Sequence, residues 1–564
     1  MAQTLLNILF MLSRVTRTKT VVSPMSPAQM TIEPIKESGF AARIALLGLS
    51  AILLMVDFSR AEGAVINATG SSLSAVQSAV TSASPGDTVE VPAGTAVWTN
   101  SLIINADIQL IGAGQGQTII TNNVPLSVNS GTMFFWTTSS NGICRLSGFT
   151  FAGGAVDTNH STSSRNFYFG GNCHAMRIDH CDFTGLNQDH NLEFFGWIYG
   201  VIDHCNFTTP STDIMVHDDT YGGQQYGDGS WADSDRWGTT NALYIESCNF
   251  VGSPPYGALD AVDGARIVFR FNYLTNSAIG SHGTESTGRS RSIRMIEAYG
   301  NTFLALSYQP WDNQPLEEAI YLRGGTATVF SNTFIGGFKY MLKCSLYRLY
   351  PNHFTAWNNI SGVNPWDSNS ATLFDSGICS QGIWTSGTSY VTDTNKNWTN
   401  DHWAAGYTIY DVQQGLGIPI SDNNSNELWF GNYNPYGSAF VINTGENYQI
   451  HQVRAAIDQV GYGQGDLLTG DTPINTTTGT AAWPHELSDP IYEWGNVWNY
   501  SDQSSYPGVK MSSDAQPLIS PGVNWLDDVV RPGYTPLVYP HPLVSGISAP
   551  VTPTLSPPSG LQAH

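Results

Sequence analysis

The segments Met176-Arg-Ile-Asp-His-Cys181-Asp-Phe183, Gly200-Val-Ile-Asp-His-Cys205-Asn-Phe207 and Leu243-Tyr-Ile-Glu-Ser-Cys248-Asn-Phe250 repeat one pattern. In each segment an apolar residue is followed by two polar ones, Cys, a polar residue and Phe. An earlier copy ends at Phe149-Thr-Phe151, and later copies carry Asn in place of Cys, at Asn272, Asn301, Asn332, Asn358 and Asn496. A recurring unit of this length is the sequence signature of a solenoid, in which each unit packs only on its neighbours.

The spacing of the repeat predicts the fold. From position 149 to position 358 the copies lie 24 to 43 residues apart, whereas one coil of a parallel β-helix needs about 22 to 25 residues, with the excess in loops. We therefore predict an all-β, right-handed parallel β-helix of about ten coils. Stacking would align Cys181, Cys205 and Cys248 in an inward thiol ladder, because a free Cys behaves as a small buried hydrophobe. The Asn copies would form an amide ladder at a turn.

The beginning of the chain fits a capped solenoid. Ser72 to Ala83 carries apolar residues at helical spacing, so we expect a helix over the open end of the first coil. The runs Gly86-Asp-Thr-Val-Glu-Val-Pro-Ala-Gly94 and Ile108-Gln-Leu-Ile-Gly-Ala-Gly114 follow.

These runs resemble the opening of the pectate-lyase-like right-handed β-helix superfamily, and with the ladder the resemblance covers roughly residues 65 to 360 and 453 to 500. That superfamily includes polysaccharide lyases, galacturonan hydrolases, phage tailspikes and secreted proteins of unassigned role. The resemblance implies the fold, not one function. Because its catalytic motifs are not reproduced, it assigns no catalytic residue.

Composition and charge narrow the class of protein. The chain has 564 residues, only 12% of them charged, and a formal net charge of -22. Low charge argues against disorder, and the acidic balance argues against a nucleic acid partner, which needs a basic face. Seven Cys are an odd number, so a disulfide framework is incomplete, and we expect these residues to be structural and reduced.

The apolar stretch from Ile44 to Val56, preceded by Lys36 and Arg43, predicts a signal peptide; the alternative is a single membrane anchor. We therefore expect a secreted or cell-surface protein with no membrane contact after signal removal. We divide the chain into a leader (1–61), a β-helix (62–380), a small inserted β module (381–452), final β-helix coils (453–540) and a Pro-rich tail (541–564).

The first candidate site is the long loop from residue 217 to residue 237. Clustered carboxylates in a Gly-rich loop can bind Ca²⁺, and the candidate ligands are Asp218, Asp219, Asp228, Asp233 and Asp235. Flat aromatic side chains can stack on sugar rings, and the candidates are Trp231, Trp237, Tyr221 and Tyr226. The alternative is a solvated acidic loop whose aromatics pack on the helix. We expect no organic cofactor.

The second candidate site is the stretch from Asp260 to Glu297. Arginine binds carboxylates bidentately, so Arg266, Arg294 and the more distant Arg323 are candidate contacts for an anionic sugar. For a lyase, His282 would be the base and Arg289 or Arg291 would neutralise the carboxylate. For a hydrolase, Asp260 with Asp263, or Asp218 with Asp219, would supply the two carboxyl groups. The alternative is that these Arg pair with acids on adjacent coils.

Together these patterns predict a polysaccharide-active protein, a lyase or hydrolase acting on an acidic polysaccharide. The alternative is a non-catalytic carbohydrate-binding surface protein, an adhesin or tailspike-like binder. We expect the loops to leave one corner of the helix, with the ligand groove between residues 217–237 and 260–294. The sequence leaves the oligomeric state open.

Overall fold

A computed structural model describes residues 63–138, 142–155, 164–252, 257–283, 291–306, 316–344, 367–385, 388–403, 407–430, 441–456, 458–465, 486–499, 509–513, 519 and 521–546. Residues 1–62 lie outside this description, so the signal peptide stays a prediction. Within the described residues, no helix is long and apolar enough to cross a membrane.

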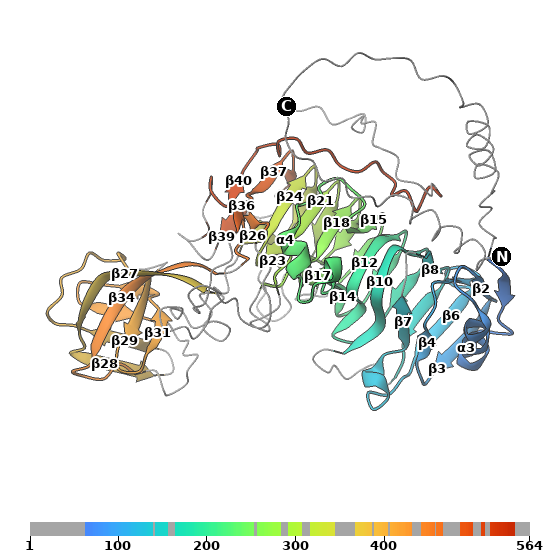
Figure 1. Cartoon of the computed structure of the whole chain (residues 1–564), viewed down its shortest axis with the longest axis horizontal. Coiled ribbons are helices and arrows are strands. Elements are labelled where there is room, and N and C mark those ends of the chain that lie inside the picture. The colour runs from blue at the N-terminus through green and yellow to red at the C-terminus, as the bar shows by residue number, and fades with distance from the viewer. Residues whose placement is uncertain are drawn as a thin grey trace, which may run out of the picture. The chain divides into compact units, whose positions relative to one another are not determined.

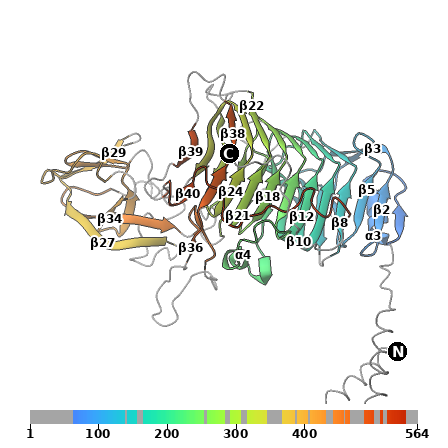
Figure 2. The ribbon, with the colours of Figure 1, turned by 90° about the horizontal axis from the view of Figure 1, so that it is seen from above.

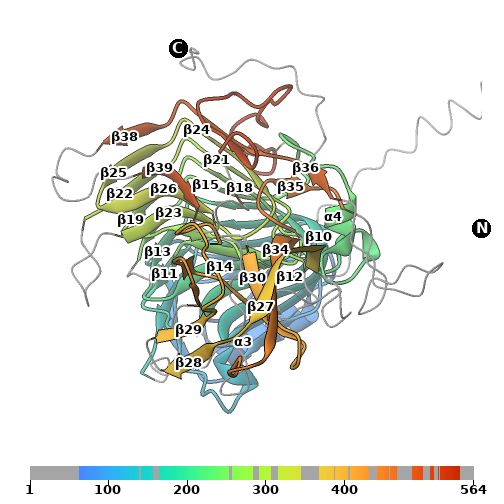
Figure 3. The ribbon, with the colours of Figure 1, turned by 90° about the vertical axis from the view of Figure 1, so that its left-hand side faces the viewer.

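Three parallel sheets form the body of the protein, and each turn of the chain contributes one strand to each sheet (Figure 1; Figure 3). Sheet 1 contains β1 (Val65–Asn67), β2 (Thr88–Val91), β5 (Gln109–Gly112), β8 (Cys144–Ser147), β10 (Arg165–Asp179), β12 (His190–Asp203), β15 (Leu243–Glu246), β18 (Arg266–Arg270), β21 (Met295–Tyr299), β24 (Thr326–Phe330), β37 (Ile491–Trp494) and β40 (Trp525–Leu526). Sheet 2 contains β4 (Leu102–Ile104), β7 (Phe134–Thr138), the first halves of β10 and β12, β14 (Thr212–His217), β17 (Leu259–Val262), β20 (Ile279–Gly280), β23 (Leu316–Leu322), β26 (Phe338–Cys344) and β39 (Val509–Ser513).

Sheet 3 has ten strands: β3 (Gly94–Trp98), β6 (Thr118–Asn122), β9 (Thr150–Gly153), β11 (Asp182–Thr184), β13 (Asn206–Thr208), β16 (Asn249–Val251), β19 (Tyr273–Thr275), β22 (Thr302–Ala305), β25 (Thr333–Gly336) and β38 (Val497–Asn499). The chain runs from sheet 2 to sheet 1 to sheet 3 and then into the next coil. Crossovers between parallel strands of one sheet are right-handed almost without exception. The prediction of a right-handed parallel β-helix is therefore confirmed.

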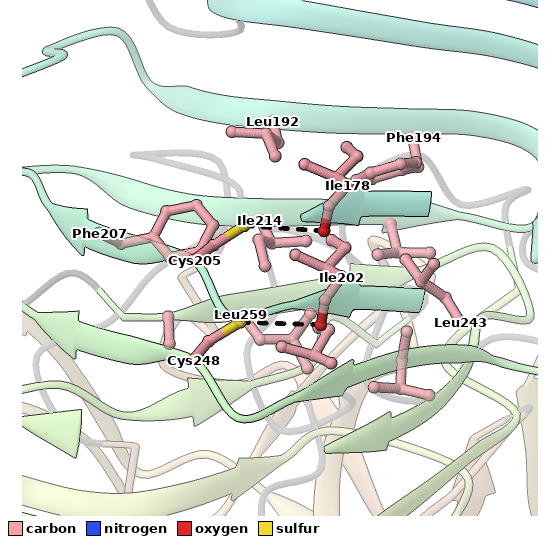
Figure 4. Close-up of a cluster of buried hydrophobic side chains, with 14 of the residues drawn as sticks. Ile178, Leu192, Phe194, Ile202, Cys205, Phe207, Ile214, Leu243, Cys248 and Leu259 are labelled. Carbon is pink, nitrogen blue, oxygen red and sulfur yellow. Dashed lines mark hydrogen bonds between the residues drawn. The ribbon is translucent and has the colours of Figure 1, made fainter. Parts of the chain in front are cut away.

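Identical positions stack inside the helix, as the repeat predicts. Phe183, Phe207 and Phe250 are buried, and their ring centroids lie 4.8 and 4.7 Å apart in nearly parallel pairs. The thiols of Cys205 and Cys248 point at the carbonyl oxygens of Ile178 and Ile202 at 3.6 and 3.7 Å (Figure 4). All cysteines are buried and free. The thiol ladder is confirmed as part of the hydrophobic core.

The Asn ladder occupies the turn between sheets 1 and 3. The Oδ1 of Asn301 accepts the backbone N–H of Asn272 at 2.9 Å, and its Nδ2 donates to the carbonyl of Phe269 at 2.8 Å. The same bonds continue through Asn332 to Asn496. Each copy follows a turn residue with positive φ, such as Phe271 (φ 55) and Gly300 (φ 67). The ladder therefore satisfies buried backbone groups that the sharp turn leaves without a sheet partner; Asn358 lies outside the described residues.

The capping helix is α3 (Leu73–Ser82). Ser72 caps its N-terminus by accepting the N–H of Ala75 at 3.3 Å, as Ser commonly does at this position. Val76 and Val80 are buried against the first coils. The prediction of a helix over residues 72–83 is confirmed.

The predicted module between late coils consists of two antiparallel sheets. One contains β27 (Asp367–Ile378), β34 (Asn447–Ala456), β30 (Tyr407–Asp411) and β31 (Leu416–Pro419), and the other contains β28 (Gln381–Thr385), β29 (Thr388–Thr392), β33 (Glu427–Trp429) and β32 (Asp422–Asn423). Its core is separate from the helix core and includes Trp403, Leu428 and Tyr448. The strands begin before and end after the predicted range of 381–452. A two-stranded ribbon of β35 (Tyr462–Gly463) and β36 (Leu487–Ser488) follows.

The end of the chain differs from the prediction. Residues 529–546, here called the strap, cross the outer face of sheet 1 back toward earlier coils. Tyr534 bonds Glu297 at 2.6 Å, His541 N–H donates to Glu246 at 2.9 Å, and the carbonyl of Leu543 accepts from Arg177 at 3.2 Å. Figure 2 shows this dark red segment crossing the coils. Residues 529–540 are therefore not coils, and residues 541–546 are not a free linker, because the outward aromatic residues of sheet 1 give them a packing surface.

Candidate functional site

Three long connections, among them the loops of both candidate sites, leave the same corner, between sheets 2 and 1. Residues 218–242 join β14 to β15, residues 281–294 join β20 to β21, and residues 345–490 join β26 to β37. The short turn 263–265 joins β17 to β18 at the same place. The prediction that the loops share one corner is confirmed. On one side of the corner lies a buried wall, and on the other lies the outer face of sheet 2.

The corner wall comprises residues 218–242, 291–294, 458–465 and 486–490. It includes the short 3-10 helix η2 (Tyr221–Gly223) and helix α4 (Asp228–Ala232), which is visible beside the coils in Figure 2. At its centre Arg291 contacts Asp458 at 2.7 Å, Glu486 at 3.3 Å and Asp228 at 3.4 Å. Burial works to lower the pKa of Arg291, but these carboxylates outweigh it and raise that pKa. Arg291 is thus the counter-ion of three acids.

The other predicted Arg of the wall are occupied in the same way. Arg294 pairs with Asp235 and Asp489. Arg266 donates to the carbonyls of Ser230, Ser234 and Asp235, and its guanidinium lies 4.9 Å from the ring centre of Tyr221. Arg266, Arg291 and Arg294 are at most 1% exposed. The prediction that they contact substrate is wrong in this structure, because a buried guanidinium must be paired internally.

The aromatic platforms of the first site are also corrected. Trp231 is 0% exposed and donates its indole N–H to the Ser292 carbonyl at 2.8 Å, so no sugar can stack on it. Tyr221 is buried and bonds Asp233 at 2.6 Å. Trp237 packs against the Arg531 guanidinium at 4.2 Å and bonds Asp235 at 2.7 Å. Tyr226 is half-buried with a φ of 63°. The aromatics fasten the wall to the helix, which is the alternative that the sequence left open.

The five predicted Ca²⁺ ligands do not converge on one point. Asp228, Asp233 and Asp235 each face an Arg, and Asp219 accepts the N–H of Tyr226. Asp218 is 1% exposed and accepts from Tyr199 and from the Arg266 backbone, both at 3.0 Å. Burial is the main cause that raises the pKa of Asp218 to about 7. These carboxylates accept hydrogen bonds and ion pairs from the protein's own donors, and the structure does not bring the five predicted Ca²⁺ ligands together.

The sheet 2 face is the outer surface of sheet 2, where side chains alternate with the buried core residues of each strand. Its outward residues are Arg165, Tyr168, His190, Glu193, Phe195, His217, Asp260, His282, Tyr321, Arg323 and Lys343. Most of these side chains are only half-buried, whereas Arg291, Arg294 and Trp231 of the corner wall are almost completely buried. A ligand can therefore contact the sheet 2 face but not the centre of the wall. Consecutive coils are about 4.8 Å apart, so the row follows the helix axis as an extended binding surface.

The central group of this face is His282, Asp260 and Arg323. The Nδ1 of His282 lies 2.8 Å from Asp260, the Arg323 guanidinium lies 3.9 Å from the same carboxylate, and the three side chains are 28%, 19% and 12% exposed. Burial works to raise the pKa of Asp260, but His282 and then Arg323 outweigh it and lower that pKa. Asp260 is therefore a stable carboxylate that orients the imidazole. The sequence identified all three residues.

A second group of charged side chains lies beside the first on the sheet 2 face, around His217 of β14. His217 contacts Asp263 through Nδ1 at 2.8 Å and Glu193 through Nε2 at 3.3 Å, and Arg165 pairs with Glu193. Burial works to lower the pKa of His217, but Asp263 and Glu193 outweigh it and raise that pKa to about 9. Asp263 is thus committed to an imidazolium and is not available as half of a hydrolytic carboxyl pair. Asp263 follows the end of β17, between His282 and Arg291. The backbone N–H of His282 donates to the carbonyl of Ala261, and the backbone N–H of Asp263 donates to the carbonyl of Arg291.

Aromatic rings flank both groups. Phe195 lies 4.9 Å from His217 and 6.4 Å from Tyr168, measured between ring centroids. On the other side, the ring of Tyr321 has Arg323 at 5.3 Å and Lys343 at 5.2 Å. Sequence reasoning missed Glu193, Tyr168, Phe195, Tyr321 and Lys343, although they alternate with apolar residues as strand residues do. Arg289 lies outside the described residues.

No family model matches the chain, and no curated protein does. Among solved structures, a mutant tailspike protein of E. coli bacteriophage HK620 in complex with a pentasaccharide aligns with 11% identity, a TM-score of 0.28, and coverage of 66% of this chain and 82% of that one. An alginate lyase from Paenibacillus sp. str. FPU-7 aligns with 16% identity, a TM-score of 0.20, and coverage of 50% and 90%. Both scores are low, so the fold and the site rest on the strand pairings and contacts described above.

Proposed function

We propose that this protein cleaves an acidic polysaccharide by β-elimination on the sheet 2 face, with His282 as the base. The observation that supports this is the group of His282, Asp260 and Arg323, which is partly exposed and lies in the middle of a row of polar and aromatic side chains. We also propose that it acts outside the cell, as the leader suggests.

The chemistry follows from the contacts of His282. The Nδ1 of His282 lies 2.8 Å from Asp260, so we assign Nε2 as the ring nitrogen that takes the proton α to a uronate carboxylate. The C–H electron pair becomes a carbon–carbon double bond, and the glycosidic oxygen leaves with the electron pair of its broken C–O bond and takes a proton from water. Arg323 would face the carboxylate, whose negative charge grows as the proton leaves. The Tyr321 ring and Lys343 would hold the adjacent sugar.

Hydrolysis fits the same face less well. A hydrolase needs one carboxylic acid with a raised pKa to protonate the leaving oxygen. On this face the pKa of Asp260 is lowered, and that of Glu193 is lowered because His217 and Arg165 outweigh burial. The raised pKa of Asp218 belongs to a carboxyl that is 1% exposed. A non-catalytic binder would use the same surface, and the experiment below distinguishes a binder from a lyase.

The test is a comparison of two histidine variants across a panel of uronate polymers. His282→Ala should lower the formation of unsaturated uronate products by about 100-fold or more while leaving polymer binding nearly intact. The matched control is His180→Ala: His180 is also partly exposed and also contacts an Asp, at 2.8 Å, but at the turn between sheets 1 and 3.

Several results would contradict the proposal. Reducing-sugar release without unsaturated products would indicate a hydrolase. Polymer binding with neither product would indicate a binder. Equal losses in both variants, or an unchanged rate in His282→Ala, would remove His282 from the role of base.

A further inference from the structure

The row of outward side chains on the sheet 2 face is interrupted at Gly280 of β20. Gly280 pairs with Tyr321 on the following coil, and the pairing of Leu259 with Ile279 places it beside Asp260 on the preceding coil. Asp260 and Tyr321 are half-buried and carry outward side chains, whereas Gly280 has none. The face therefore has a gap between Asp260 and Tyr321 with Gly280 at its base, here called the notch.

The backbone at Gly280 would accept a side chain. Among the described residues, the heavy atoms nearest to the position of an added Cβ are the carbonyl oxygens of Leu259 at 3.8 Å and of Tyr321 at 4.0 Å. These are ordinary van der Waals distances. The φ angle of Gly280 also lies outside the left-handed region that favours glycine. Neither sterics nor backbone conformation therefore requires a glycine at this position.

Other glycines of this sheet do have such a requirement. Gly171 and Gly196 have positive φ, and an added Cβ at either would collide with a carbonyl oxygen of the preceding coil. A Cβ at Gly170 would strike the ring of Tyr168. A glycine inside a strand weakens it, and it often marks a bulge or a place where a backbone or a ligand approaches closely. At Gly280 the pairing with β23 is in register and the neighbouring backbone leaves room, so ligand contact is the reason that remains.

The notch lies beside the group of His282, Asp260 and Arg323. His282 follows Gly280 by two residues, about 7 Å along the chain, and its Nδ1 lies 2.8 Å from Asp260 at one side of the notch. Arg323 follows Tyr321 at the other side, and its backbone N–H donates to Ser281 Oγ at 3.1 Å. A ring lying against Gly280 would therefore be within reach of both the imidazole and the guanidinium.

We propose that the notch is the subsite for the uronate ring that reacts, with Gly280 as its floor; this rests on the proposed function. The ring lies against the backbone of β20, with its α-carbon turned toward His282 and its carboxylate toward Arg323. The next sugar of the polymer then lies over Tyr321. A side chain at position 280 would lift the reacting ring away from the base, so the missing side chain sets the depth at which the polymer binds.

The experiment compares Gly280→Ala and Gly280→Val in the full chain, with polygalacturonate and alginate as the uronate polymers. Gly280→Val should lower kcat/KM for unsaturated products by about 100-fold, the loss expected when a reacting group is displaced by about 1 Å. Gly280→Ala should lose less, and its pH profile should match that of the wild type, because the added Cβ leaves the contact of His282 with Asp260 in place. Urea midpoints of both variants should be unchanged or higher, since glycine weakens a strand.

The matched control is Gly70→Val. Gly70 also has room for a Cβ and a φ outside the left-handed region, but it precedes the capping helix and not the sheet 2 face. This variant should keep the wild-type rate and affinity.

A folded Gly280→Val with wild-type kcat/KM and polymer affinity would overturn the proposal. An equal loss in Gly70→Val, or a shifted pH profile in Gly280→Ala, would also overturn it. If Gly280→Val does not fold, the rate and affinity of Gly280→Ala decide in the same way.

Failure of the elimination reaction gives a different result. Wild-type protein that binds a polymer without forming unsaturated products would refute elimination alone, and Gly280→Val should still weaken that binding. Wild-type protein that binds neither polymer would overturn both proposals.

Discussion

Two regions on either side of one corner look alike in sequence and differ in the structure. The corner wall and the sheet 2 face are both rich in Asp, Arg and aromatic residues. In the wall Arg291, Arg294 and Trp231 are at most 1% exposed and bind other parts of the chain. On the face, His282 and Asp260 are partly exposed. Burial, not residue type, decides which cluster can meet a ligand.

The largest expected effect is on the wall. Arg291→Met leaves Asp228, Asp458 and Glu486 without their shared counter-ion, and removing one partner of a buried ion pair typically costs about 3–5 kcal/mol. Urea denaturation should show this loss. Arg236→Met in the same loop is the control, because the Arg236–Asp233 pair is largely exposed and such pairs contribute at most about 1 kcal/mol. A soluble variant with unchanged stability and lost substrate affinity would instead place Arg291 in the binding site.

The Asn ladder should show the next largest effect. Asn301→Ala removes a side chain that accepts from Asn272 and donates to Phe269 and Asn332. The buried groups it leaves unsatisfied should lower the free energy of unfolding by about 2–3 kcal/mol. Asn249→Ala, on the outer side of sheet 3, is the exposed control and should cost less. An equal loss of unfolding free energy in Asn301→Ala and Asn249→Ala would mean that the ladder's hydrogen bonds do not stabilise the fold.

Much of the fold follows from the sequence because a solenoid repeats its constraints. The inward Phe and Cys and the turn Asn recur at matching positions, and each predicted ladder is present. The site was harder to predict because a coil has three corners and three faces, and the repeat does not reveal which loops are covered. Arg291 is buried by Asp458 and Glu486, more than 160 residues away along the chain. The strap was missed because its partners are outward aromatics of sheet 1, which the repeat pattern leaves undefined.

The pH dependence of stability should show whether His217 is held as an imidazolium. Folded His217 has a pKa of about 9 against an ordinary value of 6.5. The contribution of His217 to the free energy of unfolding is therefore complete below pH 6.5 and is lost as the pH rises through 9, by about 3 kcal/mol. His217→Gln should flatten the stability curve over this window, measured by urea denaturation at several pH values. The control is His190→Gln, because burial lowers the pKa of His190. A wild-type curve already flat from pH 6.5 to 9 would show that His217 is not held as an imidazolium.

The smallest expected effect is at the edge of the face. Lys343→Met removes the cation beside Tyr321 and should weaken binding of a uronate polymer by about 1 kcal/mol. Binding of the carboxyl-reduced polymer should change less. Lys396→Met, in the separate module where Lys396 pairs with Asp375, is the control and should leave affinity unchanged. An equal loss for both polymers would indicate that Lys343 has a structural role.

The central claim is that the ligand lies on the sheet 2 face and not against the corner wall. The most direct measurement is a crystal structure of His282→Ala with a bound uronate oligosaccharide. We expect sugar density running along the helix axis over Asp260, Tyr321 and Arg323, with a carboxylate within hydrogen-bond distance of the Arg323 guanidinium. Sugar bound to residues 218–237, or to the module with the sheet 2 face empty, would contradict the account.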